Sequence, residues 1–304
     1  IDPFSVISIA ESRALSKKHS DPTYLFFENL RGFNFRTLGH LYSRTPMLNY
    51  SQYPAGQKTN RKGSIDIMKN IQNLEEYTIS SSPDTIYNHS AGVYASHMIV
   101  HDIFSKSYEN YTYNYIDNFF NERHVDSFGS KPIFPLANVL PINPEGDDIA
   151  DYPAKQYLQP TTGKSFDNSV QDNSSQTPFT PHNPQKSMQI RNAHMQMLNT
   201  ALQVNIDVLG TTVIAAGDIV ECNIPFSGTY TTTQNEVFDR LYKGRFLIKA
   251  IRHDFNPAEN QHTMSMNLCK DNFLEPLEAP EENYEPKSKR SKGTITETWD
   301  DIGF

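Results

Sequence analysis

The chain is poor in cysteine, in tryptophan and in long apolar runs. Its 304 residues include two cysteines, Cys222 and Cys269, too few for a disulfide framework although one bridge is open to them. We expect two free thiols in a reducing compartment. No run approaches the roughly 20 apolar residues of a membrane-spanning helix, so no stable membrane insertion is expected. The chain begins without methionine and without a basic leader segment, and we interpret it as a fragment or a processed product that carries no signal peptide.

Basic residues are fewer than acidic residues. There are 27 Lys and Arg against 35 Asp and Glu, a formal net charge of -8. Specific recognition of nucleic acid is therefore not expected, because it depends on cations that neutralise phosphates. Aromatic residues, by contrast, are abundant, with 18 Phe and 16 Tyr. This composition favours a β-rich protein with extended contact surfaces.

Hydrophobic periodicity predicts an α+β fold that is mainly β. Alternating patterns predict strands at 24–29, 33–35, 76–80, 92–104, 111–115, 204–209, 219–224, 245–255 and 261–271, with a short extended piece at 85–87. The turn before Phe33 and the turn at 256–260 each predict a hairpin. Helical spacing predicts helices that begin near Ser64 and near Ser187, and one helical turn at 37–42.

These elements divide the chain into five segments. Residues 1–45 are interpreted as the end of a preceding mixed α/β domain. Residues 46–125 and 187–272 are expected to form two halves of one small antiparallel β-barrel or sandwich with packed helices. Residues 126–186 are rich in proline and predict a long irregular insertion, and 273–304 predict a flexible C-terminal tail.

The usual chemical motifs are incomplete. His97 and His101 lack a third ligand and lack the glutamate that a zincin helix places beside its first histidine. The sequence at 161–165 ends like a phosphate-binding loop, but the position that requires glycine is Leu158. No nucleophile has an adjacent activating base. We therefore expect no catalytic residues, no cofactor and no metal ion.

One larger pattern is informative as a unit. A helix leads into a strand that ends at a Val-x-Gly, a Gly-Asp-x-Val turn and strand follow, and an aromatic strand ending in histidine precedes a returning strand. The residues that carry it are Val208, Gly210, Gly217, Asp218, Val220, Phe246, Ile248, Ile251 and His253. The pattern resembles the baseplate central hub family of contractile-tailed, T-even-type phages, which is related to late control protein D and to the hub part of type VI secretion spikes. The aromatic strand, turn and strand at 24–35 are similar to that family too.

The resemblance implies a fold and a function. It implies a tail-tube-like β domain in a non-enzymatic structural protein of the virion, which assembles in the host cytoplasm and is located in the tail baseplate. Three chains would form a homotrimeric ring that joins the hexameric tail tube protein to the central spike protein, with DNA passing through the lumen. The family's first tube domain is not visible in this sequence.

Two other functions stay open. One is a tail-associated cell-wall hydrolase that uses scattered carboxylates, with Glu109, Glu122, Asp147 and Asp151 as candidates. The other is a host-surface adhesin, suggested by the Asn/Ser/Thr-rich insertion. In the C-terminal tail, Trp299, Ile302 and Phe304 are interpreted as anchors that dock on a partner, with a plain disordered tail as the alternative.

Overall fold

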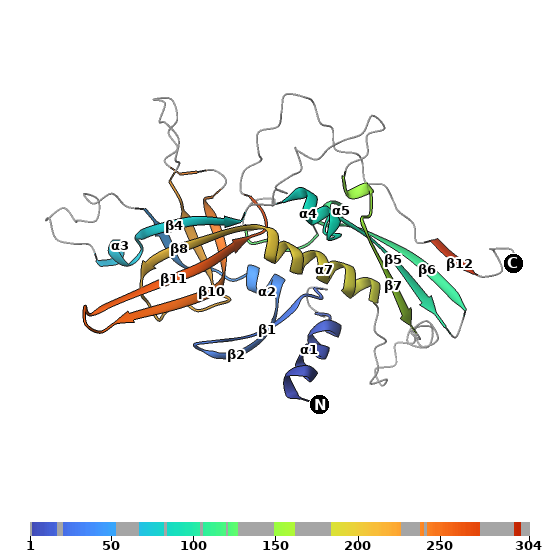
Figure 1. Cartoon of the computed structure of the whole chain (residues 1–304), viewed down its shortest axis with the longest axis horizontal. Helices are drawn as coiled ribbons and strands as arrows, with labels where there is room; N and C mark the ends of the chain where they lie inside the picture. The colour runs from blue at the N-terminus through green and yellow to red at the C-terminus, as the bar shows by residue number, and fades with distance from the viewer. Residues whose placement is uncertain are drawn as a thin grey trace, which may run out of the picture.

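The computed structural model describes residues 2–16, 21–52, 67–81, 84–103, 106–119, 121–126, 149–161, 184–225, 238–239, 242–273 and 295–298. Within these residues the fold is α+β and mainly β, as expected (Figure 1). It contains a six-stranded sheet, a four-stranded sheet and a separate two-stranded hairpin.

The six-stranded sheet is strongly curled into a half-barrel. Its strand order is β3 (Pro46–Ser51), β9 (Ile219–Asn223), β10 (Gly244–Asn256), β11 (Gln261–Lys270), β8 (Leu202–Leu209) and β4 (Leu74–Ser81). The predicted strands at 204–209, 219–224, 245–255 and 261–271 are confirmed, and β10 and β11 form the predicted antiparallel hairpin. The sheet is mixed rather than purely antiparallel, because β3 runs parallel to β9. Met264, Met266 and Leu268 point into its core.

The two edge strands of this sheet approach each other at one point. Ser51, at the end of β3, forms an isolated parallel bridge with Asn73, just before β4. The short helix α3 (Ile67–Ile71) precedes this bridge. The curled sheet therefore nearly closes on itself at one end.

The second sheet has the order β12 (Ile295–Thr298), β6 (Ser107–Asn114), β5 (Ala95–Asp102) and β7 (Lys155–Thr161). Helices α4 (Thr85–Ser90), α5 (Tyr115–Phe119) and α7 (Pro184–Thr200) lie beside it, with the 3-10 turn η2 (Ile149–Asp151) (Figure 1). Ala193 and Met197 of α7 share a core with Tyr94 and Phe119. Residues 46–125 thus supply strands to both sheets, while 202–270 supply only the curled one.

Three local predictions need correction. Residues 85–87 are helical, because the Asp84 side chain caps α4 by accepting a hydrogen bond from the Tyr87 N–H. The helix expected from Ser187 begins earlier, at Pro184, a residue suited to a first turn. The interval expected to be irregular contains η2 and the strand β7, which includes Pro160. Because β7 is an edge strand, a proline there removes no essential hydrogen bond of the sheet.

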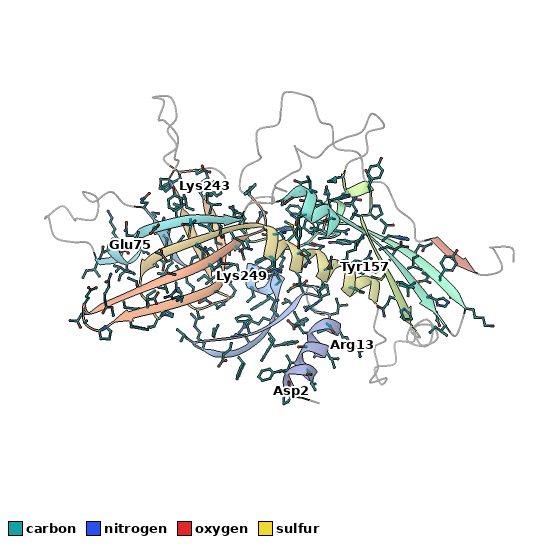
Figure 2. All side chains as sticks on the ribbon, viewed as in Figure 1. Asp2, Arg13, Glu75, Tyr157, Lys243 and Lys249 are labelled. Atoms are coloured by element: carbon teal, nitrogen blue, oxygen red, sulfur yellow. The ribbon has the colours of Figure 1, made fainter. Side chains whose placement is uncertain are left out.

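Most of the N-terminal unit lies below the two sheets in Figure 1, and its last helix lies between them. It consists of α1 (Pro3–Arg13), the hairpin of β1 (Tyr24–Asn29) and β2 (Gly32–Thr37), and the short helix α2 (Leu38–Tyr42). The predicted hairpin is confirmed, with Gly32 at the positive φ of 106° that its turn requires. Asp2 caps the start of α1 and Arg13 ends it (Figure 2). Helix α1 has no buried residue, so hydrophobic burial contributes little to holding it in place.

Candidate functional site

All nine residues that carry the hub resemblance lie on the curled sheet or its turns. Val208, Val220, Phe246 and Ile248 belong to its core cluster, and Ile251 packs against that cluster from a partly buried position. The remaining members are Gly210, Gly217, Asp218 and His253. The pattern therefore describes one continuous piece of structure, formed by β8, β9, β10 and the turns between them.

Gly217 and Asp218 form the turn that leads into β9. Gly217 has a φ of 88°, and a Cβ added there would lie 2.6 Å from Cζ of Phe27 in the N-terminal hairpin. Glycine is needed at this position both for the backbone conformation and for the close approach of the aromatic ring. The turn is thus also the surface on which the hairpin rests.

The Asp218 carboxylate is completely buried between two arginines of the N-terminal unit. Arg31 donates from Nη1 to Oδ1 at 3.0 Å and from Nη2 to Oδ2 at 2.7 Å, a bidentate pair. Arg44 Nη1 lies 2.6 Å from Oδ1, and the Ala215 N–H donates to Oδ2 at 3.0 Å. We call these four residues the Asp218 corner. It joins segments that are 187 residues apart in the sequence.

A second glycine of the pattern makes room for a cluster of rings at the open end of β10 and β11. A Cβ on Gly210 would lie 2.2 Å from the ring of His262. His253 Nδ1 lies 3.1 Å from His262 Nε2, and the exposed Phe255 ring stacks on His262 at 4.1 Å. The absence of a side chain at Gly210 therefore leaves the space that the His262 ring of this cluster occupies.

The outer face of the N-terminal hairpin carries stacked aromatic rings. Tyr24 stacks on Phe35 at 4.8 Å, and Phe26 stacks on Phe33 at 5.7 Å. Phe33 and Phe35 remain 66% and 43% exposed. Phe4 of α1 contacts the edge of this group and is also exposed. We call these five rings the aromatic face. Contiguous exposed apolar surface of this kind is typical of contact surfaces between proteins.

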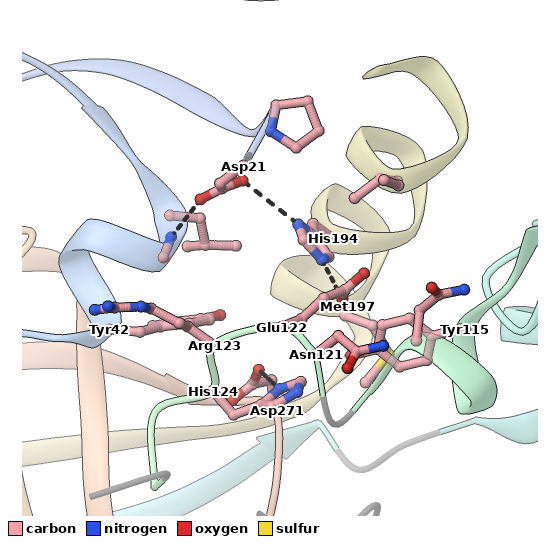
Figure 3. A pocket seen from close by; sticks show the side chains of 15 residues that line it. Asp21, Tyr42, Tyr115, Asn121, Glu122, Arg123, His124, His194, Met197 and Asp271 are labelled. Carbon is pink, nitrogen blue, oxygen red and sulfur yellow. Dashed lines mark hydrogen bonds and ion pairs between the residues drawn. The ribbon is translucent and has the colours of Figure 1, made fainter. Parts of the chain in front are cut away.

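A pocket of about 350 Å³ lies where the N-terminal unit, the loop after α5, α7 and the end of β11 meet (Figure 3). Its ionisable lining residues are Asp21, Tyr42, Tyr115, Glu122, Arg123, His124, His194 and Asp271. Apart from the consecutive Glu122, Arg123 and His124, these residues come from distant parts of the chain and belong to no sequence motif, so the sequence does not predict the pocket. We call it the junction pocket.

His194 of α7 is held in this pocket by three residues from two other segments. Its Nε2 donates to the Glu122 carboxylate at 2.6 Å, and its Nδ1 lies 2.7 Å from Thr23 Oγ1 and 3.9 Å from Asp21 (Figure 3). Burial lowers the pKa of His194, but the hydrogen bond and charge of Glu122 together with the charges of Asp21 and Asp271 outweigh it, so the pKa is raised.

His124 is more strongly constrained. Its Nδ1 lies 2.7 Å from Asp271 Oδ2, and its Nε2 lies 2.7 Å from the carbonyl oxygen of Phe119. Both partners can only accept, so both ring nitrogens donate and the imidazolium form is favoured. Burial lowers the pKa of His124, but Asp271 and the Phe119 carbonyl outweigh it, and the pKa is raised. A buried ion pair of 2.5 Å joins the same two segments, between Asp126, two residues after His124, and Lys270, one residue before Asp271.

The junction pocket does not form a nucleophilic triad, despite a suggestive order of groups. Thr23, His194 and Glu122 present a hydroxyl, an imidazole and a carboxylate in series. However, Thr23 is completely buried and is not part of the pocket wall. Its hydroxyl therefore meets no substrate from the pocket, and the series positions the imidazole.

The four candidate carboxylates of a hydrolase are not brought together at this pocket. Glu122 lines it and also accepts a hydrogen bond from the Tyr113 hydroxyl at 2.9 Å. Glu109 is on β6 and accepts from Tyr111, and Asp151 is in η2; neither lines the pocket. Asp147 lies outside the described residues, as do Trp299, Ile302 and Phe304.

The structure also shows the surroundings of the two cysteines and of the residues that could bind a metal ion. Cys222 and Cys269 are buried free thiols, and burial raises the pKa of both. Among the described residues, no set of three or more His, Cys, Asp or Glu side chains is arranged to hold a metal ion. In the same part of the chain no helix has the length and apolarity to cross a membrane.

Comparison of the chain with protein-family models and with curated proteins finds no match in either case. The hub resemblance therefore depends on the residues quoted for it and on their arrangement.

Proposed function

We propose that the chain is a baseplate central hub subunit that forms a homotrimeric ring, adapts the hexameric tail tube to the central spike and lets DNA pass through its lumen. The observation that supports this most directly is the placement of the nine pattern residues on one curled sheet. A tail-tube-like domain requires such a sheet, because a curved wall must surround the channel.

The aromatic face supports the proposal from a second direction. Its rings are preorganised by stacking on each other, and Phe33 and Phe35 are exposed. Obligate interfaces bury roughly 2,000 Å² or more and are enriched in aromatic residues. In the proposed ring this face lies between chains, or between the hub and the tail tube or spike protein.

The net charge of -8 suits a conduit for DNA. An acidic inner wall repels phosphates and keeps the cargo from adhering. We expect the lumen of the assembled ring to be acidic and expect no specific recognition of nucleic acid; a basic lumen would contradict this part of the proposal.

The test is the oligomeric state of the longest natural form of the chain. We expect light scattering after size exclusion to give a trimer, and negative-stain electron microscopy to give a three-fold ring. Phe33→Asp should weaken the assembly, whereas Ile86→Asp, a change of an 83% exposed residue on α4, serves as the matched control. A stable monomer at all concentrations that recruits no spike or tube protein would refute the proposal. Cell-wall cleavage lost on Glu122→Gln would instead favour the hydrolase.

A further inference from the structure

The four-stranded sheet has two sides at which a further strand could pair, and they differ in how they are protected. Strand β7 forms one edge and contains both Lys155 and Pro160, residue types that discourage such pairing. Strand β6, toward the other edge, contains neither lysine nor proline, and its only charged residue, Glu109, accepts a hydrogen bond from the Tyr111 hydroxyl. The outer side of β6, which faces away from β5, is therefore protected only if another segment covers it.

The structure covers this side of β6 with a short strand from the C-terminal part of the chain (Figure 1). Strand β12 (Ile295–Thr298) pairs antiparallel with β6, with Ile295 opposite Asn110 and Thr298 opposite Ser107. On its other side β6 pairs with β5 along its whole length. Strand β12 has four residues against the eight of β6, so the cover extends over half of the strand.

The sequence of the C-terminal tail favours a strand at the same residues. Residues 274–293 contain no valine, isoleucine or threonine, whereas four of the five residues at 294–298 are isoleucine or threonine. These β-branched residues favour extended backbone. Between residues 274 and 298, strand propensity is therefore concentrated in the segment that pairs with β6.

We infer that the outer side of β6 is a docking site for an extended strand, and that β12 of the same chain occupies this site as a removable cover. Main-chain hydrogen bonds to the edge of a sheet are a recurring way in which proteins bind peptides. The partner that fits here is an extended segment rich in β-branched residues that runs antiparallel to β6. Such a partner gains access to the site by displacing β12.

The connection to β12 explains why its own strand occupies the site and why this strand can leave. Residues 274–294 link Phe273 to Ile295, and a tether of this length holds the strand at an effective concentration on the order of 1 mM. At micromolar protein the strand of a second copy therefore does not compete. Four residue pairs form a small contact, so a matching strand at high local concentration replaces it. The inference concerns one chain and does not depend on the hub proposal.

The first test asks whether β12 occupies the site, and it uses engineered disulfides in the full chain. Ile295→Cys with Asn110→Cys places two thiols directly opposite each other in the ladder, within the Cα separation that a disulfide needs. The matched control combines Ile295→Cys with Glu109→Cys, because the adjacent residue of β6 projects to the other face of the sheet. The native Cys222 and Cys269 are buried and do not compete. We expect rapid disulfide formation within single chains for the first pair and not for the control.

The second test asks whether the cover is removable. A labelled peptide of residues 291–300 is titrated, with fluorescence anisotropy as the readout, into the unmodified full chain and into its Thr296→Pro/Glu297→Pro variant. Successive residues of an edge strand alternate in facing the ladder, so one of the two prolines removes a hydrogen bond to β6. We expect the variant to bind the peptide about tenfold more tightly than the unmodified chain, because its own strand no longer competes. The same double change at Ser288 and Lys289, outside the strand, should leave the affinity at the unmodified value.

Several results would overturn the inference. The two cysteine pairs might cross-link equally or not at all, or the peptide might bind the unmodified chain and the Thr296→Pro/Glu297→Pro variant with the same affinity. Cross-linking between mixed chains that each carry one of the two cysteine changes would assign the cover to a second copy and contradict the inference as well. Circular dichroism checks that the proline variant is folded; if it is not, the disulfide test decides the question.

Discussion

Removing the charge of Asp218 should loosen the N-terminal hairpin and lower the free energy of unfolding. The substitution Asp218→Asn keeps the size of the side chain but replaces one acceptor oxygen by an N–H₂ group that faces an arginine. The carboxylate accepts two hydrogen bonds from Arg31 and one from the Ala215 N–H, and it forms an ion pair with Arg44. Asparagine can satisfy only part of this set.

The size of this loss in unfolding free energy follows from how deeply the Asp218 carboxylate and its two arginine partners are buried. Removing one partner of a fully buried ion pair costs about 3–5 kcal/mol, because the remaining charge is left uncompensated. Here the carboxylate is 0% exposed, but the Arg31 and Arg44 side chains are 43% and 31% exposed. Water therefore solvates the released guanidinium groups in part, and we expect a loss of about 2–4 kcal/mol.

Urea unfolding followed by far-UV circular dichroism gives the free energy, and amide hydrogen exchange gives its location. Exchange should accelerate first in β1 and β2. Asp207→Asn, an exposed carboxylate on β8, is the matched control and should change stability by less than about 0.5 kcal/mol. If Asp218→Asn costs no more than this control, or if exchange in the hairpin is unchanged, the corner does not hold the hairpin and the reasoning is wrong.

Three further outcomes are expected. Gly217→Ala should destabilise by about 2–4 kcal/mol, more than Gly32→Ala, because both glycines have positive φ but only Gly217 has an aromatic ring within 2.6 Å of the new Cβ; urea midpoints of the two variants compare them. Because the pKa of His124 is raised in the folded state, its protonation stabilises the fold fully below the ordinary pKa near 6.5, and this stability is lost as pH rises through the raised value. The free energy of unfolding should therefore fall between pH 6 and pH 9, and His124→Gln should make it depend less on pH. Burial raises the pKa of Cys269 to about 12 and raises that of Cys222 further, so a thiol reagent at pH 8 should label the native chain slowly and the unfolded chain at both positions; rapid native labelling would contradict their burial.

The strands of the curled sheet were predictable because their signals are local. The run at 261–271 alternates apolar and polar residues, and Met264, Met266 and Leu268 reach the core as the alternation requires. The hairpin at 24–35 was predictable for the same reason, with Gly32 at its turn. In both cases neighbours in sequence are neighbours in space.

Other elements depend on tertiary context. The strand β7 contains Pro160, a residue that argues against a strand unless it lies at an edge, and sequence alone does not show which strands are edges. The mixed character of the curled sheet follows from the parallel pairing of β3 with β9, which are far apart in the chain.

The polar sites were not predictable at all. The sequence predicts a turn at Asp218, but the arginine partners of this residue are 187 and 174 positions away and belong to no motif. Likewise Glu122 and His194 meet across 72 positions. The sequence around a single carboxylate or histidine does not show whether the side chain is buried or which distant residue it contacts. These contacts become visible only in the folded structure.

The two polar sites hold the same N-terminal segment from opposite ends. Asp218 holds Arg31 at the tip of the hairpin, and His194 holds Thr23 at its base. A two-stranded ribbon is marginally stable alone, so these contacts fix the position of the aromatic face. Fixing it in advance reduces the entropy that association would otherwise cost. If the aromatic face is the interface of the proposed ring, Asp218→Asn should therefore weaken assembly under conditions in which the chain is still fully folded.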